Sequence, residues 1–379
     1  MTSSETVTAG LSATRRAVAT ARRIVVKIGS SSLTTTEGGL DGRRLDTLVE
    51  TLSRRVAEGS QVVLVSSGAI AAGLAPLGLG GRPGDLATQQ AAASVGQQTL
   101  AHAYAASFAR FGLTVGQVLL TADDVVRRAH YRNARRTLRR LLNLGAVPVV
   151  NENDTVATAE IRFGDNDRLA ALVAHLVEAD ALVLLSDVDA LYDGDPRAGR
   201  ARAVREITTA EDLEGISVGG TGSSGLGTGG MTSKVQAARV ACSAGIPALL
   251  TSAELAEEAL GRAEVGTAFG TTGPRLSARR FWLAHAASAR GRLHLDAGAV
   301  SAVVRRRRSL LAAGVTGMEG SFEGGDVVEL VGPSGEVVAR GVVAYDASEL
   351  PELIGRSSHE LPAEQRREVV HADDLAPLD

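Results

Sequence analysis

The chain is poor in lysine, cysteine and aromatic residues. Only two of its 40 basic residues are lysine, and 3 % of its 379 residues are aromatic. The single cysteine, Cys242, excludes an intrachain disulfide framework and is typical of a protein kept in a reducing compartment. The seven histidines have no cysteine partners at zinc-site spacing. We therefore expect neither a disulfide-stabilised secreted fold nor a metal site built by the protein.

Long hydrophobic runs are missing as well, which argues against a membrane-spanning helix. The charge-free stretch 62–81 contains five glycines and Pro76, and these residues predict a strand, a turn and a helix start. The first twenty residues are rich in Ser, Thr and Ala without an apolar signal region, so we predict a disordered extension over residues 1–20. A cytoplasmic protein is expected.

The charges do not form a nucleic-acid-binding surface. Residues 291–379 contain nine arginines and fifteen acidic residues, and the rest of the chain carries a small positive excess. The only basic run that would support RNA binding is 305–308, and it has no interleaved aromatics for base stacking. We do not expect nucleic acid as a partner.

Short apolar runs alternate with helix-length segments up to about residue 265. The runs 62–65 and 182–185 are continuously apolar, as in strands covered on both faces of a parallel sheet. This alternation predicts an α/β fold, a doubly wound αβα sandwich with a mostly parallel sheet. The predicted strands are 23–28, 61–66, 114–120, 147–151, 181–186 and 247–251, and the predicted helices are 43–57, 88–111, 133–144, 166–178 and 232–244.

The pattern changes beyond Gly291 to short β runs separated by glycine-rich turns. These runs, at 293–295, 300–304, 327–330 and 337–343, predict a small β-rich C-terminal domain. The predicted organisation is an extension (1–20), an α/β domain (21–268), a linker (269–290), the β-rich domain (291–371) and a tail (372–379).

The two lysines both lie beside glycine-rich segments. Lys27 is followed by Ile-Gly-Ser at the end of a predicted strand, and Lys234 follows the segment 225–233. A lysine ammonium is a compact point charge whereas a guanidinium is a broad fork, so retained lysine predicts a confined site around a phosphate. The glycines lack the spacing of a Walker loop. The segment after Lys27 fits an ordinary strand-to-loop turn equally well.

Polar clusters follow several predicted strands. Residues 151–154 (Asn-Glu-Asn-Asp) and 165–167 (Asp-Asn-Asp) are too many for helix capping alone, which predicts a functional site. The segment 66–73 opens a helix after the second strand. It fits either a ligand-binding helix start or close packing of a helix on the sheet. Ser186 and Asp187 end a buried strand at a position where a nucleotide base or ribose could bind.

Taken together, these motifs resemble those of the amino acid kinase family. They occur in the family's order and cover nearly the whole of residues 22–265, and the residues from 291 onward resemble a PUA domain. The motifs are 26–29, 66–73, 151–154, 164–167, 191–192 with 195–197, and 225–234.

The resemblance implies ATP-dependent phosphorylation of the side-chain carboxylate of L-glutamate, the first step towards proline, with Mg²⁺ carried on the nucleotide. It implies that Lys27 and Lys234 bracket the transferring phosphoryl group and that Asp167 orients them. Ser67, Asp154 and Asn166 match substrate-binding positions. The positions that match ATP-binding residues are Lys27, Ser186, Asp187, Thr228, Gly229, Gly230, Met231, Thr232, Ser233 and Lys234.

The family also suggests feedback inhibition by proline and assembly into homodimers or homotetramers. Three alternatives stay open at this point. The first is a related kinase acting on N-acetylglutamate, carbamate, aspartate or UMP. The second is an RNA-binding protein that uses its PUA-like domain, and the third is an amino acid sensor without catalysis.

Overall fold

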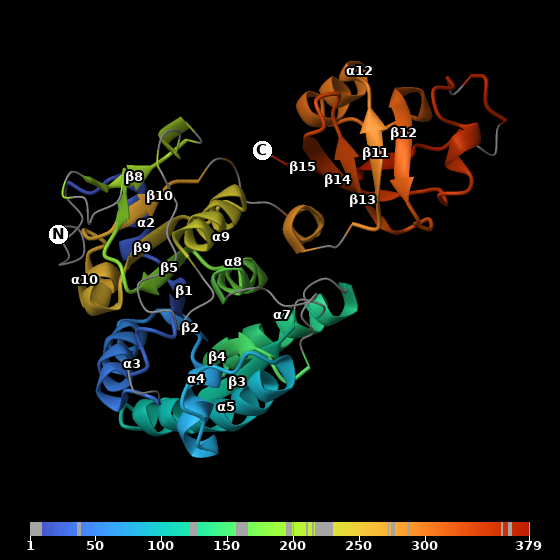
Figure 1. Ribbon diagram of the computed structural model, residues 1–379. Helices are drawn as coiled ribbons and strands as arrows, with labels where there is room; N and C mark the ends of the chain where they lie inside the picture. Colours follow the sequence, from blue (N-terminus) through green and yellow to red (C-terminus); the bar gives the residue numbers. More distant parts are fainter. Residues whose placement is uncertain are drawn as a thin grey trace. The chain divides into compact units, whose positions relative to one another are not determined.

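The computed structural model divides the chain into two compact units, with the boundary between Arg275 and Leu276 (Figure 1). The residues it describes are 10–35, 39–121, 124, 128–156, 166–194, 199, 201–209, 211–213, 216, 230–271, 273, 277–286, 289–357, 359–362 and 366–378.

The first unit is built on an eight-stranded sheet with the order β3-β4-β2-β1-β5-β9-β10-β8. Neighbouring strands run parallel except β9 and β10, which are antiparallel. The strands are β1 (Arg23–Ile28), β2 (Gln61–Ser66), β3 (Val115–Leu120), β4 (Val147–Glu152), β5 (Ala181–Ser186), β8 (Glu206–Ile207), β9 (Ala248–Ser252) and β10 (Thr267–Phe269), with a separate pair β6 (Leu191–Tyr192) and β7 (Ala203–Val204).

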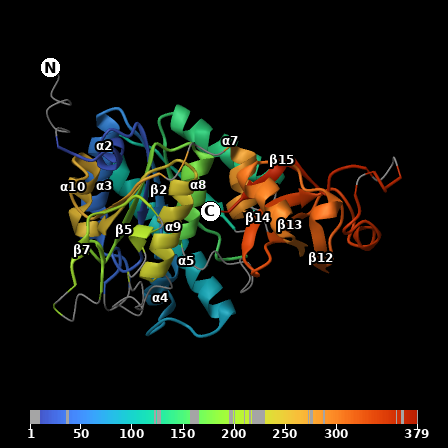
Figure 2. The same cartoon turned by 90° about the horizontal axis from the view of Figure 1, so that it is seen from above.

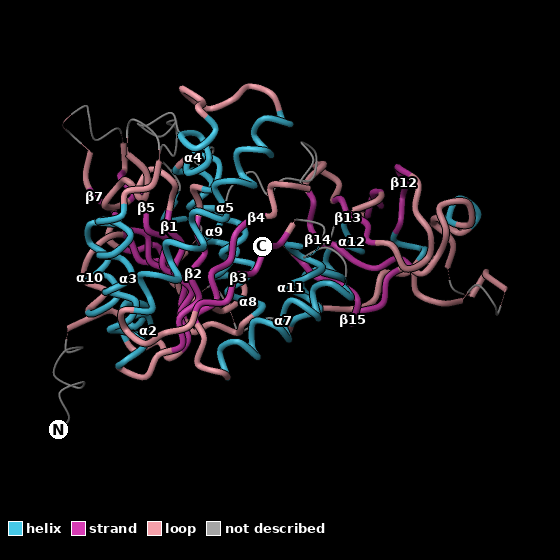
Figure 3. Tube along the Cα trace, turned by 90° about the horizontal axis from the view of Figure 1, so that it is seen from below, coloured by secondary structure: helices cyan, strands magenta, loops and turns pink. Residues whose placement is uncertain are grey.

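Helices flank this sheet (Figure 3). They are α2 (Ala13–Ala19), α3 (Gly42–Ala57), α4 (Ala69–Leu74), α5 (Leu86–Ala109), α7 (Arg128–Asn143), α8 (Asn166–Leu176), α9 (Met231–Ser243) and α10 (Ala256–Gly261), with short turns η1 (Ala75–Leu77), η3 (Glu211–Leu213) and η4 (Ala253–Leu255). None of the helices in the described part of the chain is long and apolar enough to cross a membrane.

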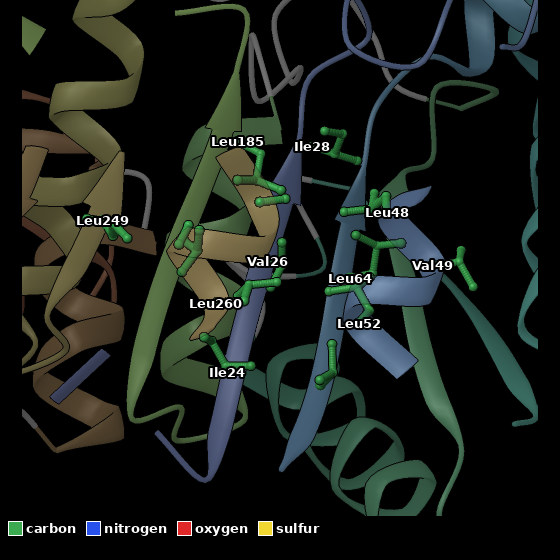
Figure 4. Close-up of a cluster of buried hydrophobic side chains, with 14 of the residues drawn as sticks. Ile24, Val26, Ile28, Leu48, Val49, Leu52, Leu64, Leu185, Leu249 and Leu260 are labelled. Atoms are coloured by element: carbon green, nitrogen blue, oxygen red, sulfur yellow. The ribbon is translucent and has the colours of Figure 1, made fainter. Parts of the chain in front are cut away.

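Strand alternation decides which side chains of β1 enter the hydrophobic core. Ile24, Val26 and Ile28 are buried against α3 and α10, where Leu48 and Leu52 meet them (Figure 4). Val25 and Lys27 therefore point to the opposite face, on which α8 packs. The α8 and α9 helices contact each other and lie side by side (Figures 1 and 2).

The second unit contains a five-stranded sheet with the order β12-β11-β13-β14-β15 and its own buried core, which includes Leu293, Leu330 and Tyr345. Its elements are α11 (Ala278–Phe281), η5 (Trp282–Ala286), β11 (Gly291–Leu295), α12 (Ala297–Val300), η6 (Ser301–Arg305), η7 (Ala312–Gly314), β12 (Val315–Gly320), β13 (Val327–Val331), β14 (Val337–Val343), η8 (Leu350–Glu352) and β15 (Val370–Pro377). The predicted fold class, a mostly parallel sandwich followed by a β-rich domain, is confirmed.

Local predictions were wrong in the C-terminal half. Residues 300–304 form the end of α12 and a π-helical turn, because Asp296 caps this helix by accepting a hydrogen bond from the Ala299 amide at 2.7 Å. Residues 278–286, expected in the linker, are helical and contact β14 and β15. Most of the predicted tail belongs to β15.

The predicted N-terminal extension also differs from the structure, because residues 13–19 form α2. Its Arg15 is buried, and the guanidinium donates to four backbone carbonyls, those of Ala263 (2.6 Å), Val265 (2.8 Å), Gly266 (2.8 Å) and Arg205 (2.6 Å). This one side chain ties α2 to segments 190 to 251 residues away in the chain, which no local pattern predicts.

Candidate active site

The candidate site lies where neighbouring parallel strands end. Strands β4, β2, β1 and β5 are adjacent and parallel, so their carboxyl ends meet at one edge of the sheet. The strand order also reverses beside β1, the kind of point at which open α/β sheets bind ligands. The carboxyl ends carry Lys27, Ser66, Asn151 and Ser186.

Two lysines converge on one carboxylate at this edge. The Nζ of Lys27 lies 2.5 Å from Oδ1 of Asp167, and the Nζ of Lys234 lies 3.2 Å from Oδ2 of the same residue. All three residues are buried, with exposed fractions of 4 % for Lys27, 7 % for Lys234 and 0 % for Asp167. The structure thus brings together the three residues that sequence analysis singled out as catalytic.

Three different elements position these side chains. Lys27 leaves β1 on the face that α8 covers, Asp167 occupies the first turn of α8, and Lys234 occupies the first turn of α9. Ser233 adds a further link, since its hydroxyl lies 3.0 Å from Oδ2 of Asp167 and 2.8 Å from the carbonyl of Gly230. The packing of α8 on α9 therefore sets the separation of the two ammonium groups.

The electrostatics of this cluster favour an anion. Burial alone would raise the pKa of Asp167, but the charges and hydrogen bonds of Lys27 and Lys234 outweigh that effect and hold this pKa below its ordinary value. Asp167 is therefore ionised near neutral pH. Two ammonium groups and one carboxylate leave the buried cluster with a net positive charge, which a phosphate group would neutralise.

A second group of side chains surrounds Asn166. Its Nδ2 lies 2.9 Å from the Ser67 hydroxyl, 3.1 Å from the Ser66 carbonyl and 2.8 Å from Oδ1 of Asn151. The other amide atom, Oδ1 of Asn166, is buried and has no hydrogen-bond partner among the described residues. A buried acceptor without a partner is costly, so it is suited to a ligand that brings a donor.

The remaining predicted site residues that the structure describes lie at the same edge or near it. Asp154 is half-buried in the turn after β4. Ser186 donates to Oδ1 of Asp187 at 3.0 Å, and Asp187 itself is exposed. Gly230 precedes α9, and Met231, Thr232, Ser233 and Lys234 form its first turn. Thr228 and Gly229 lie outside the described residues.

The segment 66–73 reaches the candidate site at one end and packs closely on a second helix at the other. Ser67 contacts Asn166 at the site, whereas Gly73 permits the close approach of α4 to α5. A β-carbon at Gly73 would lie 1.9 Å from the Ala92 carbonyl oxygen. Sequence reasoning did not identify Gln97 and Tyr104 of α5, which contact Asn151 and Ser66. These partners are 54 and 38 residues apart in the chain, and no local signal marks them.

The chain matches the amino acid kinase family over residues 22–252 and the PUA domain over residues 291–364. The chain belongs to the amino acid kinase family. It is 65 % identical over 368 residues to a protein of Rhodococcus opacus named glutamate 5-kinase, covering 97 % of this chain and all of that protein. It is 62 % identical over 365 residues to a protein of the same name from Mycobacterium bovis, covering 96 % of each chain.

A solved structure shows the same fold at low sequence identity. The carbamate kinase of Giardia lamblia, determined with AMP-PNP bound, matches with a TM-score of 0.51 and 16 % identity, covering 67 % of this chain and 99 % of that one. Among the described residues of this family member, no three or more His, Cys, Asp and Glu side chains are grouped so as to hold a metal ion.

Proposed function

We propose that this chain transfers the γ-phosphoryl group of ATP to the side-chain carboxylate of L-glutamate, giving L-glutamyl 5-phosphate, the first step of proline biosynthesis. The buried Lys27–Asp167–Lys234 cluster carries the proposal, because it offers two point charges to one small anion. The choice of glutamate is supported by relatives at 60–65 % identity that are named glutamate 5-kinase.

The chemistry requires little more than positioning and charge. The acceptor carboxylate is already ionised at neutral pH, so no general base is needed. Phosphoryl transfer passes through a loose transition state in which charge spreads over the equatorial oxygens of the moving group. Lys27 and Lys234 neutralise that charge from two directions. Asp167 fixes both ammonium groups before substrate arrives, so no reorganisation is needed during the reaction.

The group around Asn166 would hold the amino acid end of glutamate. The Oδ1 of Asn166, which has no hydrogen-bond partner in the described part of the chain, would accept from the α-ammonium group, and Asp154 supplies a negative charge after β4. The Ser67 hydroxyl adds a further polar contact beside Asn166. The amide N–H of N-acetylglutamate could also donate to Asn166, but it carries no positive charge to pair with Asp154, which favours glutamate over its N-acetylated form.

The start of α9 would receive the ATP phosphates. Gly230 is extended and has no side chain to cap this 13-residue helix, and the positive end of the helix dipole favours an anion at this position. Ser186, Asp187 and residues 228–234 are proposed to bind the nucleotide. Mg²⁺ would arrive on the nucleotide and neutralise part of the phosphate charge.

The test is an acceptor comparison with the purified chain. We expect ATP-dependent hydroxamate formation in the presence of hydroxylamine with L-glutamate, and rates near background with N-acetylglutamate and aspartate. ADP release with carbamate or UMP should also stay near background. A faster reaction with one of these acceptors would reassign the substrate, and no ADP release with any of them would contradict the proposed activity.

We also propose inhibition by proline and assembly into homodimers or homotetramers. Proline carries the same α-carboxylate and a protonated α-nitrogen, so it can compete with glutamate at Asn166 and Asp154. Added proline should raise the apparent KM for glutamate in the hydroxamate assay, and sedimentation velocity would report the oligomeric state. A rate that added proline does not change would contradict the proposed inhibition. A monomer in sedimentation velocity would contradict the proposed assembly.

A further inference from the structure

We infer that Gln97, together with Tyr104, is a positioning residue for the side chains proposed to bind glutamate. The inference rests on the proposed function and concerns α5, a helix that bears none of the predicted site residues. Gln97 and Tyr104 are seven residues apart, about two helical turns, and therefore lie on the same face of α5.

Gln97 holds Asn151 in one orientation. The backbone amide of Glu152 donates to Oδ1 of Asn151 at 2.8 Å, and because a backbone N–H is always a donor, this bond identifies the oxygen of the Asn151 amide. The opposite atom, Nδ2 of Asn151, must then donate, and it lies 2.7 Å from Oε1 of Gln97. Asn151 has an exposed fraction of 2 %, so water cannot easily replace this acceptor.

Asn151 in turn orients Asn166. Its Oδ1 accepts a hydrogen bond from Nδ2 of Asn166, which also faces the Ser66 carbonyl and the Ser67 hydroxyl. Three acceptors around one NH₂ group fix the Asn166 amide and place on the opposite side its Oδ1, which no described residue engages. Gln97 therefore acts on the proposed ammonium acceptor through one intermediate residue.

Tyr104 supports Ser66 and Ser67, which lie next to Asn166. Its buried hydroxyl lies 2.9 Å from Oγ of Ser66, and that oxygen lies 3.1 Å from the carbonyl of Ser67. The backbone turn that carries Ser67 is thus held from α5 as well. The close approach of α4 and α5 sets the position of this helix, since a β-carbon at Gly96 would lie 1.8 Å from the Ala69 carbonyl oxygen.

Loss of the Gln97 acceptor should weaken glutamate binding more than ATP binding. Asn151 would retain a buried donor without an acceptor. Its amide would rotate to satisfy that donor, and the hydrogen bond from Asn166 to Asn151 would be lost. The lysine cluster is held by its own ion pairs to Asp167. The expected signature is therefore a rise in KM for glutamate with little change in KM for ATP.

Four variants of the full chain test this inference by steady-state hydroxamate kinetics. Gln97→Met removes the acceptor at nearly constant length, Gln97→Glu keeps an acceptor oxygen, and Tyr104→Phe removes the second support. Gln98→Met is the matched control, because Gln98 is an exposed residue of the same helix. Thermal unfolding midpoints are measured for all four variants.

We expect Gln97→Met to raise KM for glutamate about 10-fold, because the buried Nδ2 of Asn151 loses its acceptor, with KM for ATP and kcat changed less than about 3-fold. Tyr104→Phe should shift the same constant in the same direction, whereas Gln97→Glu and Gln98→Met should stay within about 3-fold of the unchanged chain.

Two results would overturn the inference while leaving the proposed function intact. One is an unchanged KM for glutamate in both Gln97→Met and Tyr104→Phe. The other is an equal rise in Gln97→Glu and Gln97→Met, which would show that the acceptor oxygen is not what matters. If Gln97→Met does not fold, Tyr104→Phe and Gln97→Glu decide the question. If the unchanged chain forms no hydroxamate, the proposed function is contradicted, and the inference that rests on it fails as well.

Discussion

Asp167 is the residue on which the candidate site is organised. Its two carboxylate oxygens face one lysine each, and its side chain has no exposed surface. Breaking a buried ion pair by removing one partner leaves an uncompensated charge, which is more costly than the pair itself is stabilising. Asp167 therefore contributes both to the fold and to the proposed chemistry.

We predict that Asp167→Asn lowers the free energy of unfolding at pH 7 by about 3–5 kcal/mol, because two buried ammonium groups lose their shared counter-charge. It should also lower kcat on the order of 10²–10³-fold. Urea unfolding and hydroxamate kinetics measure the two effects. Asp187→Asn, which changes an exposed carboxylate at the same edge, is the stability control and should unfold like the unchanged chain.

The pH dependence of that stability difference has a definite sign. The pKa of Asp167 is depressed in the folded chain, so its stabilisation is fully present above the unfolded value near pH 4 and disappears as pH falls through the lower, folded value. The difference in free energy of unfolding between the unchanged chain and Asp167→Asn should therefore become smaller in acid. If this difference keeps the same size from pH 7 to pH 3, Asp167 is not an ionised carboxylate with a depressed pKa.

At the level of elements, helix α2 shows how one side chain can anchor a terminal segment. Arg15 donates to four backbone carbonyls, of which that of Arg205 also accepts from the Ala268 amide. We predict that Arg15→Met lowers the free energy of unfolding by about 2–4 kcal/mol, because these carbonyls lose a charged donor that is itself buried. Arg16→Met is the matched control, since Arg16 is exposed on the same helix. Equal unfolding curves for the two variants would contradict the anchoring role.

The parts of the fold that the sequence could predict were those with a local cause. Strands β1, β2 and β5 have the predicted bounds because each is an apolar run that ends at a polar or glycine-rich turn. The strand predicted for residues 300–304 was wrong because a short apolar run fits a strand and a helix equally well. The Asp296 cap decides in favour of the helix. Strand β12 contains glycine and glutamate and gave no strand signal.

The same distinction between local and long-range causes applies to the residues of the candidate site. Lys27, Asp167 and Lys234 could be singled out because each stands beside a strand end or a helix start. Gln97 and Tyr104 could not, because their importance depends on where α5 lies after folding. Two glycines set that position, since Gly73 and Gly96 allow the backbones of α4 and α5 to approach closely. Contacts of this kind are long-range and leave no pattern in the sequence.

On the scale of the whole molecule, the two units have separate hydrophobic cores. Every described residue of the candidate site lies in the first unit, before the boundary at Arg275. We predict that a chain ending at residue 275 folds and forms hydroxamate from glutamate at a rate within about 5-fold of the full chain, as expected for a domain with its own core. A folded but inactive truncation would show that the second unit contributes to the site.

The most direct test of the central claim is the kcat of Lys27→Arg in the hydroxamate assay, with circular dichroism and the two KM values as controls. Arginine keeps the charge but replaces a point-like ammonium by a planar fork in a space where Nζ lies 2.5 Å from the Asp167 carboxylate. If two ammonium groups must converge on the moving phosphoryl group, kcat should fall on the order of 10²–10³-fold while the protein stays folded. A kcat close to that of the unchanged chain would contradict the account.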